Sequence, residues 1–408
     1  MGEFLLLRFV HALHAGEQGM ALVFALLLAI VAMGMSVSSL TLTKSHRDLT
    51  KTRFAQGSQA AEFARSGLTE AVGWFRRQTA QPVTVFNPRL DETSTPPALD
   101  TIDPQVGLVR EFEISGSTWG RYEVWKEWPE DPDETRKLYR DALCCRDISQ
   151  ERGELTPGSV WRLRSVGYVF RRMDPTQAFD QGANHVIGKE VVEMEIRRMA
   201  LQPPGRAALN ARTASTCRIL TRGRVLGGTT AGGVYVRAGT GNVTVSGTGA
   251  SVTGGISSSA SYDDSLNAVF GVNLAELQGM ADAIILDPDE FPSPLVKNTL
   301  VVANTDLVFT PTAPLTGTGV LVVQGNVTIQ PASNSSFSGL LYVNGNLVLR
   351  EPSELQGTVV VTGSVTVQGA SDFATIAFDE GVLNRLRQTI GTYRQSTATT
   401  RPNWGDQR

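Results

Sequence analysis

Hydrophobic positions fall into three patterns along the chain, and each pattern predicts a different kind of structure. Residues 18–43 form a run of 26 positions without a charge, most of them apolar. Residues 57–75 carry small or apolar side chains every three or four positions, which is the spacing of one helix face. After residue 205, short β-branched segments alternate with glycines, a pattern typical of strands joined by tight turns.

The apolar run is long enough to cross a membrane, because about 20 apolar residues span a bilayer. A cleaved secretory signal would carry a small-residue cleavage site directly after its apolar core. Here uncharged residues continue as far as Lys44 instead. We therefore expect a retained anchor, and a continuous helix over 20–78 that would be roughly 90 Å long.

Small side chains dominate the helical face that follows the run. Because small residues let helices approach closely, this face favours packing in a helical filament over a simple tether. The residues to which we assign this assembly role are Phe24, Ala60, Ala61, Glu62, Ala64 and Leu68.

The middle of the chain predicts a small antiparallel sheet packed on the second half of this helix. Prolines at 80–105 indicate an irregular linker. Strand candidates follow at 109–128, 160–171 and 186–199. In the last of these, apolar and charged residues alternate, as in a strand with one buried face.

The second half contains an internal repeat, in which glycines six positions apart separate short β-branched strands. Successive copies begin 20 and then 18 residues apart. Such coils bury their inward side chains only by stacking, so the repeat predicts a β-solenoid. Its turn glycines are Gly319, Gly325, Gly339, Gly345, Gly357 and Gly363. We expect the segment beginning at 232 to start the stack, a helical insertion at 265–283, and a cap helix at 379–387.

Composition narrows the class of partner. The formal net charge is −3 and the pI about 5.9, so no basic field predicts nucleic-acid binding. The three cysteines are Cys144, Cys145 and Cys217, which match neither a disulfide framework nor a metal site. A bridge from Cys217 to either of the other two would require an oxidising compartment.

No residue pattern predicts catalysis, a metal or a cofactor. The chain has no nucleophile-elbow, phosphate-loop or zinc signature. Carboxylates at 263–264 and 282–290 could meet as an acid/base or metal pair, but helix capping and loop solvation explain them more simply. The acidic segment 130–134 is a solvated loop or, alternatively, a low-affinity calcium site. We expect a protein that is not an enzyme.

Two segments near the N-terminus resemble type IV pilins and pseudopilins, and PilX-type minor pilins most closely. They are the residues from Gly19 to Val23 and the stretch 59–68, which reads QAAEFARSGL. The resemblance covers about residues 16–80. It implies that a prepilin peptidase cuts after Gly19 and methylates Met20. Phe24 stands where most major pilins carry a glutamate, as in some minor pilins placed at the filament tip.

With this resemblance, the expected fold class is α+β followed by all-β. It comprises a long N-terminal transmembrane, pilin-type helix, a small antiparallel sheet, and a C-terminal right-handed β-solenoid with a helical insertion and a terminal cap helix. The expected parts are a prepilin-like leader at 1–19, the helix at 20–78, a pilin-like head at 79–202, the solenoid at 203–392 and a disordered tail at 393–408.

The expected function is that of a minor pilin or pseudopilin in a type IV pilus or type II secretion filament, acting in pilus assembly and surface display. Its partners would be other pilin subunits, the prepilin peptidase and the inner membrane, with the head in the periplasm or outside the cell. The solenoid surface would contact a glycan or a surface protein. Basic residues at 44–53 favour instead a cytoplasmic, bactofilin-like scaffold on a membrane anchor. An envelope-anchored, polysaccharide-active β-helix enzyme is the third alternative.

Overall fold

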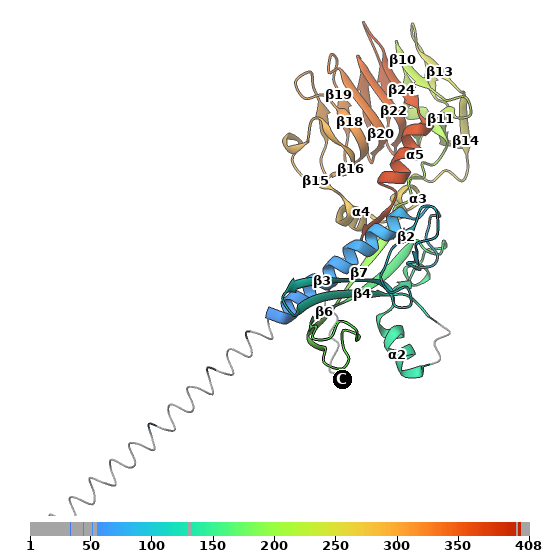
Figure 1. The fold of residues 1–408 in the computed structure, drawn as a ribbon. Coiled ribbons are helices and arrows are strands. Elements are labelled where there is room, and N and C mark those ends of the chain that lie inside the picture. The colour runs from blue at the N-terminus through green and yellow to red at the C-terminus, as the bar shows by residue number, and fades with distance from the viewer. Residues whose placement is uncertain are drawn as a thin grey trace, which may run out of the picture. The chain divides into compact units, whose positions relative to one another are not determined.

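The computed structural model describes residues 55–128, 133–396 and 399–400, together with Met33, Lys44 and Lys51. Gly19, Met20 and Phe24 therefore lie outside the described residues, as do 130–132 of the acidic segment. Strands are the predominant regular elements of the described chain (Figure 1). Its residues form two compact units. The first comprises those up to Phe63 with Glu111–Arg121 and Gly167–Glu190, and the second comprises the remainder.

One six-stranded sheet has the order β25-β7-β6-β4-β3, with β5 paired to β6. Its strands are β3 (Gly107–Ser115), β4 (Thr118–Trp125), β5 (Arg146–Asp147), β6 (Val160–Arg171), β7 (His185–Arg198) and β25 (Tyr393–Gln395). The shorter elements beside them are β1 (Leu90–Asp91), β2 (Ala98–Leu99), α2 (Glu134–Leu143) and η1 (Gln150–Arg152). The segment 109–128, predicted as one strand, is a hairpin, because Gly116 turns the chain with a φ of +54°.

The N-terminal helix is described over residues 55–77. Its small-residue face is buried: Ala60, Ala61 and Ala64 are 0% exposed and Leu68 is 2% exposed, whereas Glu62 is exposed. A Cβ on Gly67 would lie 2.3 Å from the Ser165 side chain and 2.9 Å from the ring of Tyr122. Small residues on this face thus allow close packing inside the chain. The sequence led us to expect that they would contact neighbouring subunits.

In the first unit, aromatic and charged side chains connect the helix and the strands. The rings of Phe63 and Phe112 stack with their centroids 6.2 Å apart. Glu111 accepts a hydrogen bond from Arg121 at 2.6 Å and another from Arg172. Both carboxylate oxygens of Glu111 therefore accept hydrogen bonds from arginines within the fold.

Residues 207–378 form a stack of parallel strands, called here the coil stack. Each coil contributes a strand to an eleven-stranded sheet, and most contribute one to a six-stranded sheet. The first sheet consists of β8 (Ala207–Ala211), β10 (Gly223–Leu226), β11 (Gly232–Arg237), β13 (Ser251–Thr253), β14 (Ile256–Ser259), β15 (Ala283–Ile285), β16 (Leu295–Ala303), β18 (Thr316–Val323), β20 (Ser335–Val343), β22 (Ser353–Val361) and β24 (Ala374–Phe378). The second consists of β9 (Cys217–Ile219), β12 (Thr244–Val245), β17 (Leu307–Phe309), β19 (Val327–Ile329), β21 (Leu347–Arg350) and β23 (Val365–Gln368).

The coils do not follow one another in sequence order. The path through the larger sheet is β13-β10-β24-β22-β20-β18-β16-β15, and β22 also pairs with β8 (Figure 1). The coils at 207–259 are therefore added onto the last coil of the sequence, and β24 lies inside the stack. Residues 232–259 form one end of the stack, and 283–309 form the other.

Two hydrophobic cores lie on opposite faces of the longer strands. Leu341 and Val343 point into the coil interior, while Leu340 and Tyr342 belong to an outer core. The outer core is covered by α3 (Leu266–Phe270), α4 (Leu274–Met280) and α5 (Glu380–Thr389). The strand segments after the central glycine are buried on both faces, which explains their uninterrupted apolar sequences. The remaining short helices are η2 (Ala214–Thr216) and η3 (Pro288–Glu290).

The fold class predicted from the sequence, an α+β head and an all-β region on a long N-terminal transmembrane helix, is wrong. The described chain is mostly β with large parallel sheets. None of its described helices is long and apolar enough to cross a membrane. The helix at 55–77 carries five charged residues, which exclude it from such a role. Of the residues assigned to the helix before position 55, all but Met33, Lys44 and Lys51 lie outside the described residues.

Two further expectations require correction. The helix predicted at 379–387 is present as α5, but it covers the outer face of β20 and β22 and caps no strand edge. The tail predicted to be disordered, 393–408, begins with β25, which pairs antiparallel with β7, and residues 397–398 and 401–408 lie outside the described residues. Tyr393 in this strand is 0% exposed. Both corrections arise from contacts between segments that are distant in the sequence.

Candidate functional site: the open face of the coil stack

The first halves of the long strands form the uncovered face of the coil stack. In β20 and β22 the residues before the central glycine alternate between buried and exposed, as in strands with one face in solvent. In-register pairing places Ser336 beside Glu354, Glu354 beside Thr375, and Thr375 beside Arg224. A row of hydroxyl and charged groups therefore crosses four strands.

A groove of about 480 Å³ runs along this row. Asp372 and Phe373 form part of its wall, together with Arg224 and Glu354. The guanidinium carbon of Arg224 lies 3.1 Å from the centroid of the Phe373 ring. The groove thus offers hydroxyls, two carboxylates and one cation, groups that would hydrogen-bond a polyol or a polar peptide.

A second polar feature is a side-chain ladder at the turns that follow the long strands. Asn326 donates its backbone amide to Asp306 Oδ1 at 2.7 Å, and Asn346 donates to Asn326 Oδ1 at 3.0 Å. Ser364 continues the ladder by donating its amide to Asn346 Oδ1 at 2.8 Å. Each side chain caps the turn of the next coil, so the ladder fixes the register of four turns. In three of the four coils the ladder residue directly follows a turn glycine, and this repeated position was its signal in the sequence.

The ladder predicts a specific dependence of stability on pH. Two hydrogen bonds from Asn326 lower the pKa of Asp306 below its ordinary value of 3.8. The bond from the backbone amide has the larger effect and the bond from the side chain the smaller. Because the folded-state pKa is lowered, this stabilisation is present above pH 3.8 and is lost as the pH falls through the folded-state value. Wild type should therefore lose its advantage over Asp306→Asn only in acid. Denaturation midpoints measured from pH 7 to pH 2.5 test this, with Asp289→Asn as the control for net charge. Parallel curves for wild type and Asp306→Asn would contradict it.

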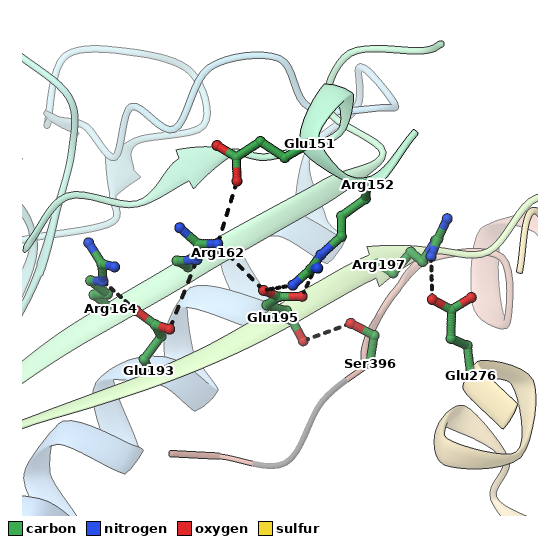
Figure 2. A network of polar contacts seen from close by, with 9 residues as sticks. All are labelled: Glu151, Arg152, Arg162, Arg164, Glu193, Glu195, Arg197, Glu276 and Ser396. Atoms are coloured by element: carbon green, nitrogen blue, oxygen red, sulfur yellow. Dashed lines mark hydrogen bonds and ion pairs between the residues drawn. The ribbon is translucent and has the colours of Figure 1, made fainter. Parts of the chain in front are cut away.

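The face of β6 and β7 away from the N-terminal helix carries a network of ion pairs (Figure 2). Arg164 Nε lies 2.5 Å from a Glu193 oxygen, and Arg152 Nη2 lies 2.5 Å from Glu195. Arg162 lies between these two carboxylates at 3.9 and 3.8 Å. Each partly buried charge faces an opposite one, so the network stabilises the sheet through many contacts, as no isolated surface pair would.

The same network connects neighbouring elements to β7 through hydrogen bonds and ion pairs. Arg197 Nη1 donates to Glu276 of α4 at 2.8 Å, and the Ser396 hydroxyl donates to the Glu195 carbonyl at 3.3 Å (Figure 2). Its charged groups therefore serve structural contacts. We assign it no chemistry.

The carboxylates considered for catalysis lie apart and are used in structure. Asp264 is 5% exposed and bonds the Arg212 guanidinium at 2.9 to 3.1 Å. Asp282 pairs with Arg394 at 2.9 Å. The remaining ones, Asp263, Asp287, Asp289 and Glu290, are exposed loop or helix-end residues. In the described part of the chain, no group of three or more histidines, cysteines or carboxylates could hold a metal ion.

The three cysteines are free thiols in the structure. Burial raises the pKa of Cys217 to about 12 and raises that of Cys145 well above its ordinary value. Neither sulfur is therefore a ready nucleophile at neutral pH. The disulfide between Cys217 and the adjacent pair, considered from the sequence, is not formed.

The six glycines predicted at turns lie in two columns of the coil stack. Gly325, Gly345 and Gly363 lie at turns, whereas the other three lie inside β18, β20 and β22. Gly319 pairs with Gly339, and Gly339 pairs with Gly357. A Cβ on Gly345 would lie 2.3 Å from the Gly325 carbonyl, and one on Gly363 would lie 2.5 Å from the Gly345 carbonyl. These close backbone approaches explain why glycine recurs.

Comparisons with known proteins complete the description of this site. No protein-family model, no curated protein and no solved structure matches the chain.

Proposed function

We propose that the chain is a minor subunit of a type IV pilin-like filament that displays the coil stack at the cell surface. The residues from Gly19 to Val23 and the stretch 59–68 support this role through their resemblance to pilins. The observation that carries the proposal most directly is the helix at 55–77, which ends the N-terminal segment with its small-residue face buried. A head fastened to that helix would move with it during assembly.

In this proposal, the prepilin peptidase cuts after Gly19 and the segment beginning at Met20 joins other subunits. The head would stand on the outer side of the inner membrane. The open polar face would then meet a glycan or a surface protein, because its exposed groups are mainly hydroxyls, amides and a few charges. Turn ladders and two buried cores give this face the rigidity that a display surface requires.

Mass spectrometry of the mature N-terminus tests this assignment. In cells with an active prepilin peptidase, the purified chain should begin at Met20 and carry an added methyl group. In cells without the enzyme, residues 1–19 should remain. Gly19→Val should block the cut, whereas Gly16→Val, three positions earlier in the leader, should not. An intact leader in peptidase-active cells would overturn the filament role.

The same result decides the second candidate. Basic residues at 44–53 follow the apolar run and favour retention of the rest of the chain in the cytoplasm. An uncut leader, together with protease protection of the coil stack in intact spheroplasts, is the outcome expected of a cytoplasmic scaffold.

A further inference from the structure

The two ends of the coil stack differ in how far their hydrophobic interior is covered. At one end the outermost strands are β12, β13 and β14, all within residues 244–259 (Figure 1). At the other end they are β15 and β17. An outermost strand presents unpaired N–H and C=O groups, which form a template for pairing with another chain. How each end is covered therefore decides whether the stack can be extended.

At the 244–259 end, the coil interior is left partly open. Ile219 and Val234 are inward-facing and 0% exposed. Their partners in the outermost coil are Val245 and Ile256, which are 40% and 48% exposed. Val252, which continues a third inward column, is only half-buried. Apolar side chains of the hydrophobic core are thus exposed to water at this end. Burying them against a partner would contribute about 25 cal/mol of binding free energy per Å² of apolar surface removed from water.

At the opposite end, the coil interior is closed. Ile285, Leu307 and Phe309 are no more than 5% exposed. The ring of Phe291, from the segment 286–294, meets that of Phe309 edge to face with the centroids 5.1 Å apart. This segment also carries three carboxylates. Aromatic covering and negative charge both oppose the stacking of a further coil.

Charge distinguishes the open end from an ordinary edge. Residues 238–262 include no charged residue and no proline. Edge strands are usually protected by one or both. A partner recognised by opposite charge would require charges here, whereas an identical surface across a two-fold axis brings any charge near the axis against its own copy. The neutral end therefore fits a second copy of itself.

We propose that two chains associate through their 244–259 ends, with β14 of one chain pairing antiparallel with β14 of the other. This joins two open interiors into one continuous core. Because 286–294 blocks the opposite end, head-to-tail addition cannot follow. The interface is then isologous and yields a closed dimer, with no route to a fibre. The dimer does not depend on the filament role, and it would link two displayed heads.

Disulfide cross-linking of the full chain in mild detergent tests the geometry. In an antiparallel pair related by a two-fold axis, a residue near the axis faces its own copy at a distance that a disulfide can span. Ser257→Cys or Ser258→Cys should therefore give a cross-linked species of twice 44.0 kDa on mild oxidation. Val308→Cys, which replaces a 50% exposed valine at the closed end, is the matched control. Equal cross-linking at both ends would overturn the proposal.

A charge introduced at the open end provides the second test. Ile256→Lys should reduce cross-linking through Ser258→Cys by about tenfold or more, because the joined core would have to bury two ammonium groups that have no counter-charge. Val308→Lys should leave cross-linking unchanged. At concentrations too low for the dimer to form, both variants should keep the wild-type thermal midpoint, since both sites are exposed. Persistence of the dimer in Ile256→Lys would refute the interface, whereas cleavage at Gly19 would be unaffected either way.

Discussion

Gly339→Ala is expected to destabilise the coil stack by about 3 kcal/mol, the upper part of the usual range for overpacking. The new Cβ would lie 1.9 Å from the Gly319 carbonyl oxygen and 2.8 Å from the ring of Phe337. Phe337 is 2% exposed and the carbonyl belongs to a paired strand, so neither can yield. The clash would separate β18 from β20 at the centre of the stack. Urea denaturation of the purified chain measures the effect.

Gly279→Ala provides the matched control. Gly279 lies in α4, and its added Cβ would lie 4.0 Å from the Ser396 carbonyl oxygen, an ordinary contact distance. Alanine there should be neutral or stabilise the chain by about 0.5 to 1 kcal/mol, because it lowers the conformational entropy of the unfolded state. Equal midpoints for Gly339→Ala and wild type would show that the glycine column is not sterically required.

Tyr393→Ala is expected to cost about 3 to 5 kcal/mol, as is usual for the loss of a large buried aromatic side chain. The ring is 0% exposed and lies 5.1 Å from that of Phe75. Its hydroxyl accepts a hydrogen bond from the Val83 amide at 2.8 Å and donates one to the Gly158 carbonyl. Removal would leave a cavity and two unpaired backbone groups. Limited proteolysis should then cut near residue 390 at much lower protease concentrations than in wild type.

Tyr393→Phe separates packing from hydrogen bonding. It keeps the ring and leaves the Val83 amide without its acceptor, at a cost of about 1 to 3 kcal/mol. The graded order of wild type, phenylalanine and alanine is the expected result. If all three resist protease equally, the C-terminal strand does not hold the head together.

Local patterns in the chain accounted for individual strands and for the repeat. Alternation in 186–199 corresponds to β7, and the repeated glycines correspond to an in-register column. These features depend on neighbours two residues or one coil away. The hydroxyl row and the turn ladder follow from the same repeat, since in-register coils place equivalent residues side by side.

Long-range contacts account for what was predicted wrongly. The pairing of β24 with β10, and of β22 with β8, joins segments about 150 residues apart, and no periodicity encodes it. The C-terminal strand pairs with residues some 200 positions earlier, so its short polar sequence resembled a tail. The small-residue stripe at 60–71 indicated close packing without indicating the partner, which proved to lie within the chain.

The amino-acid sequence alone indicated where strands form, which positions face inward and where only glycine fits. These features depend on local steric limits and on the alternation of buried and exposed residues. The arrangement of coils in space, the closed and open ends of the stack, and the fastening of the tail emerged only in three dimensions. In each case several apolar surfaces of the chain could pack against the same partner. The spacing of residues does not show which of these surfaces packs there in the folded protein.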